Sequence, residues 1–209
     1  MPYPAKHRPA VREKIIESAR RLFNKHGFDN VSVRQIMAGA GLTHGGFYSY
    51  FRAKSDLYTE VLSCFFTDPN WKQRWRGVEV DPASPDIGAQ IVRAYLSRQH
   101  LEDIENSCPM VALPTEVRRS GRAAKAAFEN VFRAMVTALE RNAEGSGHSR
   151  RARAQAIAAL CVGGLIVARA MRSDAAADEL RTDCTAIALM LGGWGTMRND
   201  SAGQLLRLG

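Results

Sequence analysis

Residues 41–54 carry the side chains of this sequence that are best suited to bind a polyanion. This run contains no Asp or Glu. Its hydrogen-bond donors are Thr43, His44, Tyr48, Ser49, Tyr50, Arg52 and Lys54. Donors without competing carboxylates suit the phosphate oxygens of a nucleic-acid backbone, which accept hydrogen bonds and ionic contacts. The pattern therefore predicts a DNA-binding surface.

Two short helices joined by a tight turn are predicted to position these donors. Ser32 is the expected N-cap of the first helix, where its hydroxyl and the Gln35 side chain form a capping box. Gly41 is expected to end that helix, because glycine adopts positive φ without steric cost. Thr43 is the expected N-cap of a second helix of about two turns. Helices in this order form a helix-turn-helix.

A plain helical corner inside a bundle is the alternative interpretation, since its turn chemistry is similar. Two features favour DNA binding instead. Gly45 and Gly46 each cost a short helix about 1 kcal/mol relative to Ala, which close approach to a groove explains better than packing does. Tyr48 and Tyr50 are also expected to face away from the apolar Phe47.

The segment from before Ser32 through Leu57 resembles the N-terminal signature of the TetR family of transcriptional regulators. The resemblance covers roughly the first 60 residues, and beyond Leu57 only the general style of the sequence is similar. The matching positions are Gly27-Phe28, Ser32-Val33-Arg34-Gln35-Ile36, Ala40-Gly41-Leu42-Thr43, Phe47-Tyr48, Phe51 and Lys54-Ser55-Asp56-Leu57.

In this family the second helix of the motif enters the major groove of DNA. By position, the resemblance implies base contacts from Thr43, His44, Gly45, Gly46 and Ser49. It implies phosphate contacts from Arg34, Tyr48, Tyr50 and Lys54, and Ser32 completes the set of DNA-binding candidates. The sequence departs from many relatives at Tyr50, where they carry His, and at Gly45-Gly46, where they carry a larger pair.

Charge and cysteine content restrict the class of protein further. The 209 residues carry a net charge of +8 and a pI near 9.7, and the first 60 hold ten Lys or Arg against five Asp or Glu. This charge favours a polyanionic partner. A membrane partner is not expected, because the basic residues do not lie opposite a strong hydrophobic face and the apolar stretch Ala156–Ala170 is too short to span a bilayer. Scattered cysteines and the lack of a secretion signal predict a cytoplasmic location.

Apolar residues recur at helical spacing along the chain and period-two alternation is nowhere sustained, so an all-helical fold is expected. Residues 1–8 are expected to form a mobile basic arm. Helices are predicted from Pro9 to about Gly27 and over residues 56–66, 86–100, 107–119, 122–144, 150–171 and 175–192. Phe28 is expected to fold back on Phe23 at the end of the first of these helices, and Ser55 is the expected cap of the next one. Pro114 is expected to break or kink its helix. The predicted domains are a three-helix helix-turn-helix domain, residues 1–53, and a larger helical effector-binding and dimerisation domain, residues 54–209.

The last two predicted helices are rich in small residues on faces that also carry larger apolar side chains. Such faces suit either an intrachain core or a two-fold interface with a second copy, and the pattern alone does not decide between them. With the family resemblance we favour a homodimer, which places two reading helices about one DNA turn (~34 Å) or somewhat more apart. The interface candidates are Ile157, Leu160, Gly164, Leu165, Ala168, Leu180, Cys184, Ile187 and Leu191.

A ligand pocket is implied by the resemblance, since members of this family bind a small inducer in the helical domain. The candidate lining residues are Trp71, Trp75, Tyr95, Cys108, Met110, Phe128, Phe132 and Met135; each of them could equally be ordinary core. Cys108 has a second interpretation as an electrophile or oxidant sensor, because Asn106 or Ser107 can cap a helix there and Pro109 suits its first turn. A buried, inert cysteine is the commoner case.

The function expected from these features is a ligand-responsive repressor that binds a near-palindromic operator in double-stranded DNA as a homodimer and is released by an unidentified small molecule. A thiol-based sensor that uses Cys108 and a transcriptional activator are the alternatives. An enzyme is not expected, because the five histidines are far apart and no metal, nucleophile or phosphate motif is present. For the same reason no cofactor or metal is expected. A protein-binding adaptor would not require the acid-free surface of residues 41–54.

Overall fold

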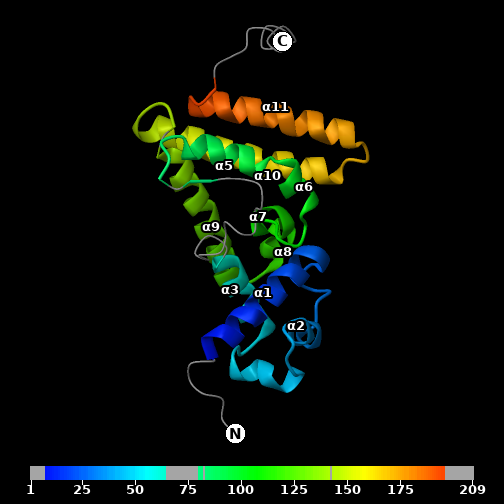
Figure 1. Cartoon of the computed structure of the whole chain (residues 1–209). Helices are drawn as coiled ribbons and strands as arrows, with labels where there is room; N and C mark the ends of the chain where they lie inside the picture. Colours follow the sequence, from blue (N-terminus) through cyan, green and yellow to red (C-terminus); the bar gives the residue numbers. More distant parts are fainter. Residues whose placement is uncertain (1–7, 65–79, 82, 142, 196–209) are drawn as a thin grey trace. The chain divides into compact units, whose positions relative to one another are not determined.

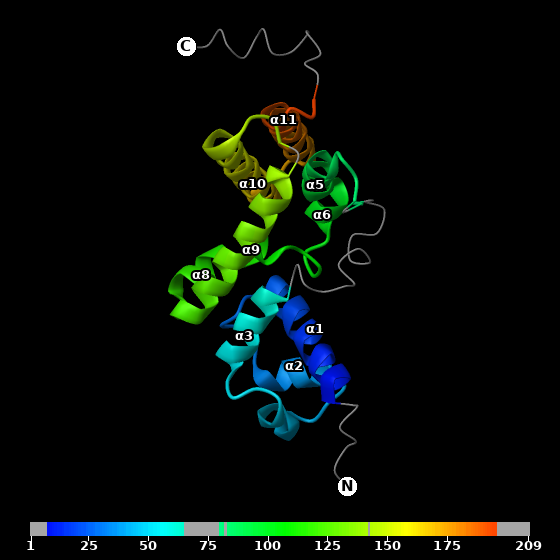
Figure 2. The same cartoon turned by 90° about the vertical axis from the view of Figure 1, so that its left-hand side faces the viewer.

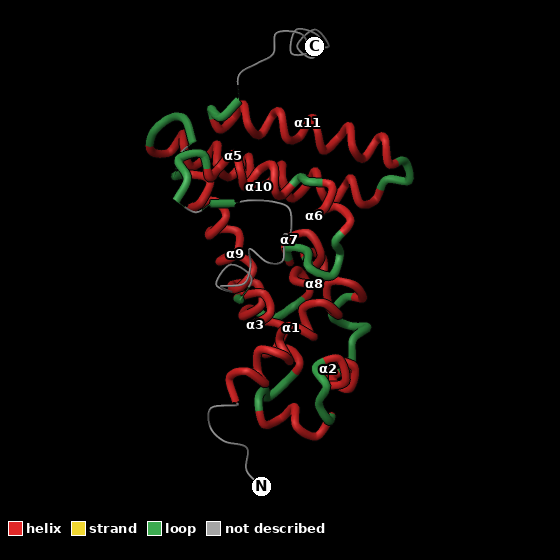
Figure 3. Tube along the Cα trace, in the orientation of Figure 1, coloured by secondary structure: helices red, strands yellow, loops and turns green. Residues whose placement is uncertain are grey.

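The computed structural model describes residues 8–64, 80–81, 83–141 and 143–195. Within these ranges every regular element is a helix and no strand is present (Figure 3). The prediction of an all-helical fold is confirmed.

The chain divides into two compact units. Unit 1 comprises Met1–Gly77 and Gln99–Ala134, and unit 2 comprises Val78–Arg98 and Met135–Gly209. Residues 99–134 therefore pack in the same unit as the N-terminal helices. The functional boundary predicted after residue 53 stays a prediction, because these units describe packing alone.

Unit 1 contains the helices of the predicted reading domain. They are α1 (Arg8–His26), α2 (Val33–Gly39), the 3₁₀ helix η2 (His44–Ser49) and α3 (Lys54–Ser63). Later in the chain come α6 (Arg98–Glu102) from its second residue, α7 (Pro109–Ala112), α8 (Pro114–Arg119) and the part of α9 (Arg122–Glu140) up to Ala134. Helix α1 packs against α2, α3 and α7, and α1 and α3 lie side by side in both views (Figures 1 and 2).

A single hydrophobic core holds unit 1 together. Helices α1, α2, η2 and α3 contribute its largest fully buried side chains, which are Ile15, Phe23, Ile36, Met37, Phe47, Leu57, Tyr58 and Leu62. Leu113, Val117, Ala124 and Ala127 from α7–α9 belong to the same core. Fully burying a large apolar side chain stabilises a fold by about 1.5–3 kcal/mol, so α7–α9 contribute directly to the stability of the reading helices.

Polar contacts also attach the segment before α7 to α1. Arg20 is 3% exposed and donates to the Glu105 carbonyl at 2.9 Å and to the Asn106 side chain at 2.8 Å. Asn24 donates to the carbonyl oxygens of Glu105 and Ser107 at 3.1 and 2.9 Å. These bonds satisfy buried main-chain carbonyls that would otherwise destabilise the unit.

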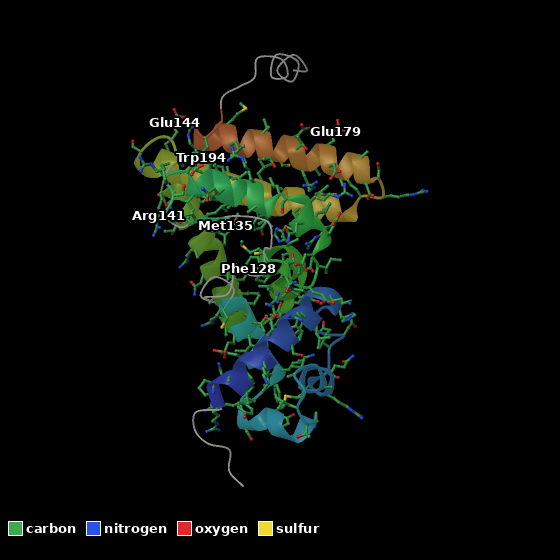
Figure 4. All side chains as sticks on the ribbon, in the orientation of Figure 1. Phe128, Met135, Arg141, Glu144, Glu179 and Trp194 are labelled. Carbon is green, nitrogen blue, oxygen red and sulfur yellow. The ribbon has the colours of Figure 1, made fainter. Side chains whose placement is uncertain are left out.

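Unit 2 is built from α5 (Ile87–Tyr95), α10 (Gly147–Ala170) and α11 (Asp174–Gly192), each of which contacts the other two. Gly164 lets α10 approach α11 closely, since an added Cβ would lie 2.8 Å from Cys184 Sγ. Trp194, just past the end of α11 (Figure 4), occupies the space left by the missing side chains of Gly88 and Gly192. Its indole therefore joins α5 to α11.

Helix α10 is long and apolar enough to cross a membrane by length and composition. In unit 2 it behaves as a core helix instead, because one of its faces is buried against α5 and α11. Ala154, Ile157, Ala158, Cys161 and Leu165 on that face are fully buried. The apolar stretch Ala156–Ala170 therefore lies in a longer helix than the stretch itself, and this helix is part of the core of unit 2.

Several predicted helix boundaries need correction. The second helix of the motif is a 3₁₀ helix of six residues, and Thr43 is its N-cap without a side-chain hydrogen bond. Two glycines in so short a helix lower its α-helical propensity. Helix α3 begins at Lys54 with Ala53 as N-cap, so Ser55 is not the cap. The predicted helix over residues 86–100 is divided between α5 and α6, and the helix predicted over residues 122–144 ends at Glu140.

The predicted break at Pro114 is confirmed, because Leu113 ends α7 and α8 begins at the proline. The contact of Phe28 with Phe23 is also present, with ring centroids 5.5 Å apart. The predicted arm and the end of the helix 56–66 lie partly outside the described residues.

Candidate DNA interface

Helix α2, a short turn and η2 form the predicted helix-turn-helix. The capping box is present as predicted: the main-chain amide of Gln35 donates to Ser32 Oγ at 3.2 Å, and the main-chain amide of Ser32 donates to Gln35 Oε1 at 2.8 Å. Gly41 follows α2 with φ of +71°, and the Leu42 amide donates to the Met37 carbonyl at 2.8 Å. A left-handed residue with such a bond ends a helix sharply and turns the chain toward the next one.

Phe47 anchors η2 in the core and thereby fixes which face of this helix is exposed. Phe47 is fully buried, whereas Tyr48 is 65% exposed. Arg34, Thr43, His44 and Ser49 are also exposed, and Tyr50 is half-buried against the core. An open hollow between α2 and η2 is lined by Arg34, Ala38, Leu42 and His44. Most of the predicted contact residues are therefore exposed on α2, the turn and η2, and Arg34 and His44 share the hollow on that face.

The electrostatics of this face favour an anionic partner. The sequence has no Asp or Glu from Asn30 to Ser55. Among the described residues, Arg34 and Arg52 form no ion pair, whereas α1 carries several cations that do. The paired cations are Arg12, Arg20, Arg21 and Lys25. The two arginines near the turn thus remain available to phosphate groups.

Lys54 has a structural role that the sequence did not reveal. Its ammonium donates to the carbonyl oxygens of Phe28 and Val31 at 2.8 Å each and lies 4.1 Å from the centroid of the Phe28 ring. Two of its three donors therefore already have protein acceptors. A phosphate contact by Lys54 stays a prediction.

Arg8 and Glu116 are interface-supporting residues that the sequence analysis missed. Arg8 donates to the Ser49 carbonyl at 3.0 Å and so ties the start of α1 to the end of η2. Glu116, on α8, accepts a hydrogen bond from the Phe28 amide at 3.0 Å. Both contacts join residues more than 40 positions apart, and no local sequence pattern indicates such a pair.

Glu116 lies near a buried phenol. Burial raises the pKa of Tyr58 well above its ordinary value, and the charges of Glu116 and Asp29 raise it further. Tyr58 is therefore neutral at any physiological pH, and its ring contacts those of Phe23 and Phe28 at 5.5 and 4.7 Å between centroids. The end of α1 and the following loop are thus held by both aromatic and polar contacts.

The structure describes six of the eight predicted pocket residues. Trp71 and Trp75 lie outside the described residues. Cys108, Met110, Phe128 and Phe132 belong to unit 1, whereas Tyr95 and Met135 belong to unit 2. Phe128 and Met135 are both on α9 (Figure 4). The ligand pocket stays a prediction.

Cys108 is the N-cap of α7, and Pro109 occupies the first turn as predicted. Its side chain is fully buried. The amide of Cys108 donates to His100 Nε2 at 3.3 Å, and Ser107 Oγ lies 3.3 Å from the same nitrogen. An electrophile would reach this thiol only after local opening, and the sensor hypothesis stays a prediction. Within the described part of the chain, no three His, Cys, Asp or Glu side chains gather as metal ligands.

The predicted interface residues differ in their exposure. Ile157, Gly164, Leu165, Ala168 and Cys184 are buried within unit 2, where they serve the intrachain core. Leu160, Leu180 and Leu191 are half-buried, and Ile187 is 40% exposed. Two apolar residues that were not predicted, Val167 and Met171, are 49% and 37% exposed on and just after α10. Contact with a second copy stays a prediction.

The geometry defines a class of protein: an all-helical chain that presents a helix-turn-helix with a basic, acid-free face. Residues 15–61 match the bacterial regulatory proteins of the tetR family. The HTH-type transcriptional regulator AcrR of Shigella flexneri is 40% identical over 51 residues, which cover 24% of each chain. The HTH-type transcriptional repressor DhaR of a Mycobacterium species is 33% identical over 61 residues, which cover 29% of this chain and 31% of DhaR.

Solved structures resemble the fold over most of its length. The reduced form of E. coli NemR has a TM-score of 0.67 at 19% identity and covers 87% of this chain and 97% of its own. A complex of SmeT with triclosan has a TM-score of 0.59 at 20% identity and covers 87% and 90%. The curated relatives, by contrast, are matched over only about a quarter to a third of their length. Residues 15–61 thus match the tetR family of bacterial regulatory proteins, and over most of its length the chain is similar to the solved structures in fold.

Proposed function

We propose that this protein is a DNA-binding transcriptional regulator that inserts η2 into the major groove. The observation that carries this proposal is the exposed, acid-free face of η2 and α2, held in place by the buried Phe47. Arg34 and Tyr48 contact phosphates in this account, and Thr43 and His44 face base edges. The major groove of DNA is wide enough to admit one helix, and each base pair presents a distinct pattern of hydrogen-bond donors and acceptors there.

Selection of duplexes from a random-sequence library, followed by gel mobility shifts, tests the proposal. Tyr48→Phe should weaken binding to all selected sequences by a similar factor, because it removes a phosphate contact. Thr43→Ala and His44→Ala should instead change the preference between sequences. Selection of no sequence by the wild-type protein would contradict the proposal.

A homodimer is the second part of the proposal. Val167 on α10 and Ile187 on α11 are exposed apolar residues, as is Met171 just past the end of α10, and a Cβ added at Gly163 on α10 would meet no atom within 4 Å. A glycine on an open helix face allows a partner helix to approach closely. Val167→Asp should convert the protein to a monomer in sedimentation equilibrium, whereas Arg172→Asp, at an exposed position of the α10–α11 turn, should not. Persistence of the dimer in Val167→Asp would contradict this interface.

Regulation by a small molecule is the third part. SmeT, whose fold is similar, has been solved with triclosan, and DhaR is a repressor by name. We propose that this chain also represses transcription inside the cell and is released from DNA by a small apolar compound. A thermal-shift screen of aromatic compounds that includes triclosan, followed by release from the selected duplex, tests this part. Stronger DNA binding in the presence of every bound compound would contradict a repressor released by its ligand.

A further inference from the structure

A second cluster of cations lies outside the helix-turn-helix, at the turn between α8 and α9. Arg118 and Arg119 are the last two residues of α8, and Arg122 is the first residue of α9. Lys125 follows three positions later. All four side chains are exposed, and residues 117–128 contain no Asp or Glu. We call these four residues the α8–α9 basic corner.

The acids that flank this corner in the sequence are engaged elsewhere. Glu116 accepts the hydrogen bond of the Phe28 main-chain amide at 3.0 Å. Glu129, the first acid of α9, pairs with Arg133 at 3.4 Å. No cation of the corner forms an ion pair with any residue that the structure describes. The corner therefore carries four charges that the described part of the protein does not neutralise.

A comparable arginine cluster at the start of α10 is paired within the protein. Arg151 pairs with Glu140 at 3.3 Å. Arg153 pairs with Glu144 at 3.7 Å. Single exposed cations without a partner are ordinary surface groups. The unusual feature of the α8–α9 basic corner is that four such cations lie within eight residues.

This arrangement is unfavourable for the free protein. Arg122 and Lys125 are three residues apart on α9, where like charges repel each other across one helix turn. Both also lie in the first turn of α9, where the positive end of the helix dipole disfavours cations. An anionic partner would offset both effects, so the placement of these charges favours anion binding over a plain solvated surface.

The position of the corner favours DNA over a small anion. Exposed side chains at a turn between two helices do not enclose a small ligand, so they suit an extended polyanion. Ala124 and Ala127 of α9 belong to the same core as the helix-turn-helix, so the corner is fixed on the unit that carries the reading helices. In Figure 2, α8 and α3 lie on the same side of unit 1, and α3 begins two residues after the unpaired Arg52. A phosphate strand that leaves the helix-turn-helix on the α3 side therefore meets further cations.

We propose that the α8–α9 basic corner binds the phosphate backbone of DNA outside the groove that η2 enters. Arginine contacts phosphate oxygens through paired N–H donors, and such contacts add affinity without reading the base sequence. This inference rests on the proposed function and extends its DNA contact to a surface outside the helix-turn-helix. It predicts that part of the DNA affinity depends on salt and on this corner, and is independent of sequence.

Salt titrations of DNA binding test the inference. The combined variant Arg118→Gln, Arg119→Gln and Arg122→Gln should weaken binding to the duplex selected by the wild type and to an unrelated duplex of equal length by a similar factor. The slope of the logarithm of the binding constant against the logarithm of salt concentration should become shallower by about 0.9 to 2.7, for one to three lost phosphate contacts. Arg118→Lys, Arg119→Lys and Arg122→Lys together should keep the wild-type slope, because lysine also neutralises a phosphate.

A triple variant in unit 2 is the matched control for net charge. Arg93, Arg141 and Arg172 are exposed arginines of unit 2 that form no ion pair with a described residue. Arg93→Gln, Arg141→Gln and Arg172→Gln together remove the same charge as the corner variant and should leave the slope unchanged. An equal change of slope in both triple variants would show an effect of net charge alone and would overturn the inference.

Thermal unfolding separates DNA binding from folding. Because the corner arginines are exposed and unpaired within the described residues, their replacement by Gln should not lower the Tm. A fall in the Tm would assign these arginines to the fold and overturn the inference. A corner variant with the wild-type slope would assign the corner to another anion, such as an acidic protein surface, and would also overturn it.

Failure of this inference and failure of the proposed function give different results. If the wild type binds no duplex, the proposed function fails and this inference fails with it. If Arg34→Gln makes the slope shallower and the corner variant does not, the helix-turn-helix contact stands and only the inference fails.

Discussion

Replacing Gly27 by alanine is predicted to destabilise unit 1 in two separable ways. Gly27 ends α1 with φ of +79°, which strains any residue that has a Cβ. In addition, the Glu116 carboxylate occupies the space that the new Cβ would take. Because Glu116 accepts the hydrogen bond of the Phe28 amide at 3.0 Å, its displacement leaves that amide without its acceptor.

The magnitude follows from these two effects. A left-handed backbone costs an L-residue about 1–2 kcal/mol, and a buried polar group left without a partner costs about 1–3 kcal/mol. Gly27→Ala should therefore lower the free energy of unfolding by about 2–5 kcal/mol. Glu116→Ala alone should cost about 1–3 kcal/mol, because it removes the same acceptor. The double variant should be no less stable than Gly27→Ala alone, since the hydrogen bond can be lost only once.

Urea unfolding of the wild type, both single variants and the double variant gives the coupling energy directly. Gly41→Ala supplies the matched control, because Gly41 has a similar φ but no neighbour within 4 Å of an added Cβ, and it should show the backbone strain alone. Strict additivity of Gly27→Ala and Glu116→Ala would refute the reasoning. So would a cost for Gly27→Ala no larger than that for Gly41→Ala.

Three further predictions concern charged and thiol groups. Arg20→Ala should lower the free energy of unfolding by about 2–4 kcal/mol, because a buried charged donor to a main-chain carbonyl is lost. Arg21→Ala, which removes a 54% exposed cation paired with the same Glu17, should cost under about 1 kcal/mol. Equal costs for the two variants in urea titrations would contradict this prediction. Lys54→Met should cost about 1–3 kcal/mol by the same assay, because the carbonyls of two residues lose a charged donor, and an unchanged urea midpoint would argue against that role. Burial, with the nearby Cys184, raises the pKa of the Cys161 thiol from 9.0 to about 12, so the folded state favours the neutral thiol. The contribution of this thiol to stability is therefore present below about pH 9 and lost as pH rises from about 9 to 12. Urea midpoints of the wild type should therefore fall more steeply over this alkaline range than those of Cys161→Ala, and parallel profiles would be inconsistent with the raised pKa.

The features that local sequence determines could be predicted from it. The Ser32–Gln35 capping box depends on residues three positions apart, and the end of α2 depends on the φ of Gly41, so both follow from residue type and spacing. The break at Pro114 follows from the missing amide hydrogen of proline. The contact of Phe28 with Phe23 likewise joins two residues that are close in sequence, across the end of α1.

Contacts between distant segments could not be predicted in this way. The hydrogen bonds from the Lys54 ammonium to the carbonyls of Phe28 and Val31 depend on how α3 packs, and no local pattern indicates them. Glu116 was not identified at all, because its partner lies 88 residues earlier. The 3₁₀ form of η2 was also missed, since caps and apolar spacing do not distinguish a six-residue 3₁₀ helix from an α-helix of similar length.

Salt dependence of DNA binding tests most directly the claim that the α2 and η2 face binds the phosphate backbone. The logarithm of the binding constant for the selected duplex should fall linearly with the logarithm of salt concentration, and Arg34→Gln should reduce the slope by about 0.9, the value for one lost phosphate contact. Arg172→Gln, at an exposed site of unit 2, should leave the slope unchanged. Binding that does not depend on salt, or equal slopes for the wild type and Arg34→Gln, would contradict the account.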